Sequence, residues 1–96
     1  MNSVEMTQQL SACRQKLAEF NVKSLAVFGS VARGQARADS DVDVLVEFDG
    51  PARFDSYMDL KLFLEELLGR PVDLLTRNGV RPELRPYVER EAVHVA

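Results

Sequence analysis

The sequence has one cysteine, no tryptophan and no long hydrophobic run. Cys13 alone can form neither an internal disulfide nor a cysteine-rich zinc site, so we expect a reducing, cytoplasmic location. The first twenty residues alternate polar and apolar residues without the continuous apolar segment of a signal peptide, and no later stretch is long enough to cross a bilayer. Secretion and membrane insertion are therefore not expected.

The chain also lacks an excess of positive charge. Twelve lysines and arginines stand against 15 aspartates and glutamates, which gives a formal net charge of -3. Broad binding to nucleic acid requires a cationic surface that displaces counterions from the phosphates. We therefore expect no stable binding to nucleic acid.

The 96 residues contain no repeat or linker and predict a single domain, residues 1–96. The spacing of apolar residues places Met6, Leu10, Cys13, Leu17 and Phe20 on one face of a first helix. Valine- and leucine-rich segments predict strands at 23–28, 42–48, 71–75 and 92–95; helices are expected at 54–68 and 82–90, and a short helix and loop at 30–37. The predicted fold class is α/β (α+β), a small mixed β-sheet with helices packed on it.

The segment Phe54–Leu68 is the clearest predicted helix. Gly69 is suited to its C-terminal cap, and Pro71 discourages continuation. Asp55, Asp59 and Glu66 share a narrow polar edge, and apolar residues occupy most of the remaining surface. This pattern predicts a helix that is either unusually buried or in contact with a partner.

Two carboxylates, Asp41 and Asp43, alternate at the start of the second strand. Successive side chains in a strand point to opposite faces, so both carboxylates lie on one face, roughly 6.5–7 Å apart along the chain. Two like charges on one face repel each other, and a hard divalent cation relieves this repulsion by taking oxygen ligands from both. The pair therefore predicts a site for Mg²⁺ or Mn²⁺.

Gly29 and Ser30 lie where the first strand ends and a short helix begins. Glycine allows a group to approach the backbone, and amides at the start of a helix donate hydrogen bonds to an anion, so these residues predict a phosphate site. Arg33 follows and either contacts the triphosphate or is a solvated surface arginine. Only an antiparallel pairing of the first two strands brings this site beside Asp41 and Asp43.

A third carboxylate, Asp73, lies in the strand after the long helix. If that helix is a crossover, the second and third strands are parallel, and Asp73 stands near Asp43. Three carboxylates beside a phosphate site can hold two cations, which indicates phosphoryl or nucleotidyl transfer.

Gly29-Ser30, ten intervening residues and then Asp41-Val42-Asp43 resemble the GS-x10-D-x-D signature of the DNA polymerase β-like nucleotidyltransferase superfamily, and Asp73 in PVDLL is similar to its third carboxylate. The chain looks like a minimal nucleotidyltransferase (MNT). The resemblance implies transfer of a nucleoside monophosphate from an NTP, with two Mg²⁺ or Mn²⁺ ions held by Asp41, Asp43 and Asp73. Gly29 and Ser30 would hold the β- and γ-phosphates.

Many MNT proteins are antitoxins of HEPN-domain ribonuclease toxins, and some transfer AMP from ATP to a tyrosine of the toxin. The resemblance therefore implies a cytoplasmic protein adenylyltransferase (AMPylation) with a HEPN toxin as partner. A non-catalytic antitoxin that masks its partner through Phe54–Leu68 is the alternative. A glycosyltransferase is a third interpretation, but it gives no reason for Gly29-Ser30.

Three further features have plainer interpretations. Arg77, Arg81 and Arg85 are expected to balance surface charge, although each could receive a phosphate or an acidic partner. His94, the only histidine, is expected to have a structural role in the last strand. Cys13 is expected to lie in the core.

Overall fold

A computed structural model describes residues 3–29, 41–50 and 53–95 of the chain. The prediction of a short helix at 30–37 falls outside these residues. The elements in chain order are α1 (Ser3–Ala12), α2 (Arg14–Glu19), β1 (Val22–Phe28), β2 (Val42–Phe48), α4 (Phe54–Leu68), β3 (Val72–Thr76), the 3-10 helix η1 (Arg77–Gly79), α5 (Arg85–Glu91) and β4 (Val93–His94).

The described strands form one mixed sheet in the order β3-β2-β1-β4. β1 pairs antiparallel with β2, and β2 pairs parallel with β3, with α4 as the crossover between them. Both pairings agree with the sequence analysis, and so does the fold class. β4 pairs antiparallel with β1, where Ala26 lies opposite His94.

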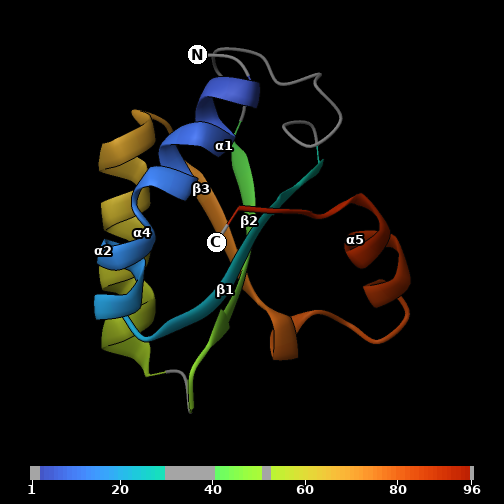
Figure 1. Cartoon of the computed structure of the whole chain (residues 1–96). Helices are drawn as coiled ribbons and strands as arrows, with labels where there is room; N and C mark the ends of the chain where they lie inside the picture. The colour runs from blue at the N-terminus through green and yellow to red at the C-terminus, as the bar shows by residue number, and fades with distance from the viewer. Residues whose placement is uncertain (1–2, 30–40, 51–52, 96) are drawn as a thin grey trace.

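Helices cover the sheet unequally. α1, α2 and α4 lie on one side of it, and α5 lies on the other (Figure 1). The core lies between the sheet and the first group, where alternate strand residues meet the apolar faces of the helices. Its fully buried side chains are Met6, Leu10, Leu17, Leu25, Val27, Val42, Val44, Val46, Leu60, Leu64 and Leu74.

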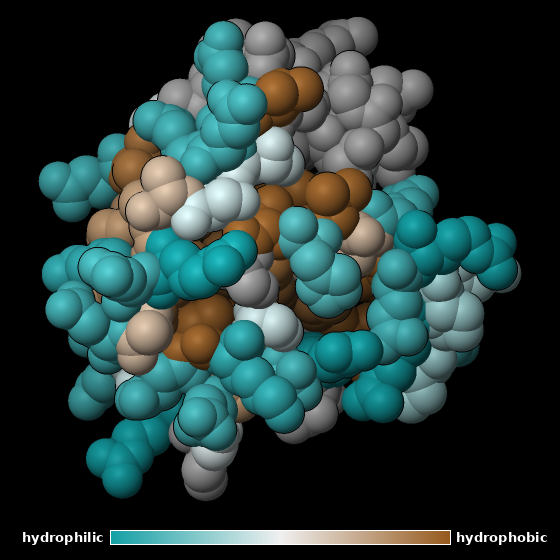
Figure 2. Space-filling model, in the orientation of Figure 1, coloured by the Kyte–Doolittle hydropathy of each residue, from teal (hydrophilic) through white to brown (hydrophobic). Residues whose placement is uncertain are grey.

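Hydrophilic side chains cover most of the face shown in Figure 2, and hydrophobic ones are visible towards its centre. The described residues include no helix with the length and apolar character that crossing a membrane requires.

The boundaries of α4 agree with the prediction. Gly69 adopts a left-handed conformation with φ 66° after its last residue, and its N–H donates to the carbonyl of Glu65 at 2.8 Å. Glycine adopts this conformation without the steric cost that a Cβ imposes. Asp55, Asp59 and Glu66 are all exposed, as the polar edge predicted.

The prediction of one continuous first helix was wrong. A turn at Cys13 separates α1 from α2, although Met6, Leu10 and Leu17 are buried together as expected. Cys13 itself is only half-buried, because it lies at this turn and not on the packed face. The shared apolar face therefore survives a break in the helix axis.

The last helix also begins later than predicted, at Arg85 and not at Pro82. Pro86 has no N–H with which to bond to a carbonyl one turn earlier, so a helix begun at residue 82 cannot run through it. Residues 81–84 form a turn, in which the N–H of Leu84 donates to the carbonyl of Arg81 at 2.9 Å. Pro86 instead occupies the first turn of α5, where a missing donor costs nothing.

Candidate functional site

One row across the sheet contains most of the described candidate residues. Phe28, the last residue of β1, lies opposite Asp43 of β2, and Asp43 lies opposite Asp73 of β3. Gly29 follows Phe28 directly. The structure therefore brings Gly29, Asp43 and Asp73 to one end of the sheet, as the predicted strand pairing required.

Asp41 lies immediately before β2 and is exposed, and Asp43 is half-buried. Val42 and Val44 between and after them are fully buried against the helices. The alternation places both carboxylates on the face of the sheet that carries α5, because strand residues two apart point the same way.

The carboxylate of Asp43 packs directly against the backbone of Gly29. Gly29 has φ 68°, a conformation that side chains disfavour, and it is buried. A Cβ on Gly29 would overlap Oδ2 of Asp43 and lie 3.2 Å from its Cγ. Glycine is thus needed here for its backbone conformation and for the carboxylate that fills the space beside it.

Side chains of α4 hold the strand that carries Asp73. β3 is an edge strand, and its outer backbone groups face α4. The hydroxyl of Tyr57 donates to the carbonyl of Leu74 at 2.5 Å, and Oε2 of Glu65 accepts from the N–H of Val72 at 2.9 Å. These two bonds lie on either side of Asp73 in the sequence and fix the edge that would otherwise be unpaired.

The donor chemistry of the site fits a hard divalent cation, because carboxylate oxygens are the ligands that Mg²⁺ prefers. Asp43 and Asp73 are on neighbouring strands, and Asp41 is two residues from Asp43. Within residues 3–29, 41–50 and 53–95, however, no three acidic, histidine or cysteine side chains converge closely enough to hold a metal ion. Carboxylates of like charge move apart unless a cation lies between them. The strand register therefore places these carboxylates near one another, and a bound ion would bring them within coordination distance.

Ser30 and Arg33, the other two residues predicted to bind phosphate, lie outside the described residues. Their predicted roles therefore stay predictions.

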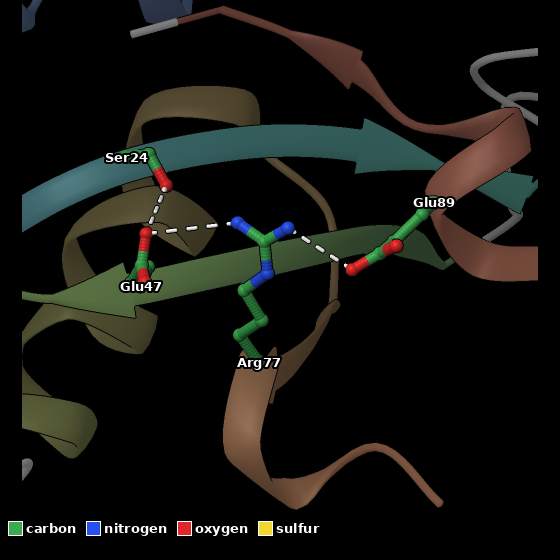
Figure 3. A network of polar contacts seen from close by, with 4 residues as sticks. All are labelled: Ser24, Glu47, Arg77 and Glu89. Carbon is green, nitrogen blue, oxygen red and sulfur yellow. Dashed lines mark hydrogen bonds and ion pairs between the residues drawn. The ribbon is translucent and has the colours of Figure 1, made fainter. Parts of the chain in front are cut away.

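A polar network on the same sheet face was not foreseen. Nη2 of Arg77 lies 3.0 Å from Oε1 of Glu89 on α5, and Nη1 lies 3.7 Å from Oε1 of Glu47 on β2 (Figure 3). Oγ of Ser24 on β1 donates to the same oxygen of Glu47 at 3.4 Å. The prediction that Arg77 balances surface charge is confirmed, and these contacts tie α5 to the sheet.

The sequence holds one signal for this network: Glu47 shares a strand face with Asp43 and Leu45. The other partners come from η1 and α5. Their approach to β2 is a tertiary contact without a local pattern in the sequence.

Comparison with known proteins identifies relatives along nearly the whole chain. The sequence profile of the nucleotidyltransferase domain matches residues 6–95. The protein adenylyltransferase MntA of Thermococcus cleftensis is 39% identical over 92 residues, which cover 95% of this chain and 93% of that relative.

Solved structures show the same fold. One that is provisionally assigned as a minimal nucleotidyltransferase has a TM-score of 0.85 and 41% identity, and the match covers 97% of this chain and 95% of that one. A Shewanella oneidensis complex of a tri-AMPylated HEPN toxin with its MNT antitoxin has a TM-score of 0.67 at 18% identity, and the match covers 94% of this chain and 71% of that one. At that identity the likeness concerns the fold alone.

Proposed function

This chain belongs to the nucleotidyltransferase domain family, and we propose that it is the antitoxin of a HEPN-domain toxin. It inactivates the toxin by transferring AMP from ATP to the hydroxyl group of a tyrosine in the toxin. The Thermococcus relative is named a protein adenylyltransferase, and the Shewanella complex contains an AMPylated HEPN toxin. We further propose that residues 1–96 act as one domain in the cytoplasm, without stable binding to nucleic acid or membrane.

The observation that carries this proposal is the row formed by Phe28, Asp43 and Asp73, with Gly29 at its end. A nucleotidyltransferase needs a place for the leaving pyrophosphate on one side of the α-phosphate and a place for the acceptor on the other, because displacement at phosphorus is in line. Gly29 and Asp73 lie on opposite sides of Asp43 in this row and meet that requirement.

We assign the roles accordingly. Asp41, Asp43 and Asp73 are the ligands for two divalent cations, Mg²⁺ or Mn²⁺, which when bound neutralise phosphate charge and favour ionisation of the acceptor hydroxyl. Gly29, Ser30 and Arg33 bind the β- and γ-phosphates, and Asp73 helps to activate the acceptor hydroxyl. The acceptor hydroxyl loses its proton to solvent, its oxygen bonds to the α-phosphorus, the bond from that phosphorus to the bridging oxygen breaks, and pyrophosphate leaves with its electron pair.

A second candidate function has its own observation. Phe54 and Leu62 on α4 are 76% and 58% exposed, although both are large and apolar. They lie about two helical turns apart on α4, and exposed apolar side chains on one helix can contact a protein partner. A non-catalytic antitoxin that masks its toxin through α4 would use Phe54 and Leu62 as contact residues.

Co-expression with the cognate toxin separates the two functions. The double variant Asp41→Asn, Asp43→Asn keeps the surface of α4 and removes two of the proposed ligands. We expect it to lose protection of growth while still folding and binding the toxin. Full protection by this variant, with unmodified toxin, would establish masking and exclude the catalytic proposal.

A further inference from the structure

The sheet face that carries Asp43 and Asp73 also has a cavity of about 90 Å³. Its apolar lining comes from Ala26, Leu45 and Ala92, and its polar lining includes Glu47, Arg77 and Glu89, members of the network in Figure 3. A cavity of this size admits one flat end of a ligand, such as the edge of a base, and not a whole nucleotide.

The cavity lies beside the row of proposed metal ligands. Leu45 is two residues from Asp43 along β2, and Glu47 is two residues further. Each such step is roughly 6.5–7 Å, so the cavity begins about one step from Asp43 on the same face. A ribose is long enough to bridge a separation of that size.

The direction of the proposed reaction leaves the side of the cavity free for the nucleoside. The line from Asp73 through Asp43 to Gly29 runs across the strands, and in-line transfer puts acceptor and pyrophosphate along it. The nucleoside is then directed away from this line. Along the strands on this face, the neighbouring positions are Leu45 and Ala26, which lie opposite each other in the register.

The charges disfavour the phosphate end of the nucleotide. The guanidinium of Arg77 is already paired with the carboxylates of Glu47 and Glu89, and the other polar lining residues are Ser24 and His94, so the lining offers a phosphate little attraction. An uncharged ring with an exocyclic amino group suits it better, since carboxylate oxygens accept hydrogen bonds and the apolar residues can pack against the ring.

We propose that this cavity binds the amino-bearing edge of the base of the nucleotide donor and that Glu47 selects the 6-amino group of adenine or the 4-amino group of cytosine over the carbonyl oxygen that guanine and uracil have at these positions. The hydrogen bond from Ser24 and the ion pair with Arg77 both use Oε1 of Glu47, so Oε2 is assigned to the amino group of the base. Guanine and uracil present a carbonyl oxygen at the equivalent position, which a carboxylate repels. This inference rests on the proposed function, because it assumes a nucleotide at Gly29 and Asp43.

Binding of ATP, CTP, GTP and UTP, each with Mg²⁺, tests the assignment by competition against a fluorescent ATP analogue. The wild-type protein is expected to prefer ATP and CTP by about tenfold, the value of one hydrogen bond to a charged group. In Glu47→Gln the amide can rotate to donate to a carbonyl, so the preference should largely disappear. Glu66→Gln, a change at an exposed residue of α4, is the matched control and should keep it.

Ala92→Phe gives an independent check, because a phenyl ring would fill the cavity from the end of α5. This variant should bind all four nucleotides more weakly and bind tripolyphosphate as the wild type does. Circular dichroism and thermal unfolding verify that each variant is folded.

The outcomes separate this inference from the function on which it rests. Nucleotide binding with an unchanged ATP preference in Glu47→Gln would overturn the assignment of the base and leave the nucleotidyltransferase intact. A folded Glu47→Gln variant could instead bind the protein acceptor more weakly and keep the normal nucleotide preference. This result would overturn the assignment of the base and show that the cavity binds a side chain of the protein partner. A wild-type protein that binds no nucleotide would refute both.

Discussion

The carboxylate of Asp43 occupies the space beside Gly29 in which any other residue would place its Cβ. This contact joins the end of β1 to the start of β2 at the point where the proposed phosphate site meets the proposed metal ligands. A substitution at Gly29 must therefore displace Asp43 or move the backbone, and either change disturbs both parts of the site.

Gly29→Ala is expected to abolish nucleotidyl transfer. Gly69→Ala is the matched control, because Gly69 has nearly the same φ, 66°, and a Cβ there would have no atom within 4 Å. Both variants bear the left-handed strain of about 1–2 kcal/mol, but only Gly29→Ala displaces a carboxylate. Thermal unfolding and an AMP-transfer assay measure the two effects. Equal activity in both variants would contradict the role of the contact.

Asp73→Asn should lower transfer by about 100-fold or more, as removal of a group that activates an acceptor does. Its stability without divalent cations should not fall, since Asp73 is exposed and lies opposite the like-charged Asp43. Asp59→Asn on the exposed edge of α4 provides the control. Near-normal activity of Asp73→Asn would remove this residue from the proposed site.

Tyr57→Phe tests the support of the edge strand. Loss of its hydrogen bond to the carbonyl of Leu74 should lower the free energy of unfolding by about 1 kcal/mol. Since this bond holds β3, transfer should also weaken, with a larger effect on kcat than on the KM for ATP. Tyr87→Phe is the control, because Tyr87 is 64% exposed on α5. A fully active Tyr57→Phe would show that β3 is held in place without it.

Leu62 and Leu64 separate partner binding from folding within one helix. Leu64 is fully buried, so Leu64→Ala should destabilise the protein by about 2–5 kcal/mol. Leu62 is 58% exposed, and Leu62→Ala should change the free energy of unfolding by less than about 0.5 kcal/mol. Pull-down with the cognate toxin then shows whether α4 contributes to the complex. Unchanged toxin binding by Leu62→Ala would weaken the masking alternative.

Local patterns in the sequence predicted much of the fold and the row of carboxylates. β2 and α4 have the predicted boundaries, because alternation fixes the first and Gly69 ends the second. The strand pairing followed from the need to bring Gly29 and Asp43 together, and the family was recognised from the same residues.

Features that depend on distant contacts were not predictable in this way. The turn at Cys13 leaves the apolar spacing intact, so periodicity did not reveal it. The packing of the Asp43 carboxylate on Gly29 depends on strand register and rotamer together. The link from Arg77 to Glu47 and Glu89 requires η1 and α5 to fold back over the sheet.

The most direct test of the proposed function is the intact mass of the cognate HEPN toxin after incubation with this protein, Mg²⁺ and each NTP in turn. With ATP, the toxin should gain one or more AMP increments on a tyrosine, and with the Asp41→Asn, Asp43→Asn variant it should gain none. A toxin that is neutralised by the wild-type protein without any increase in mass would contradict the account.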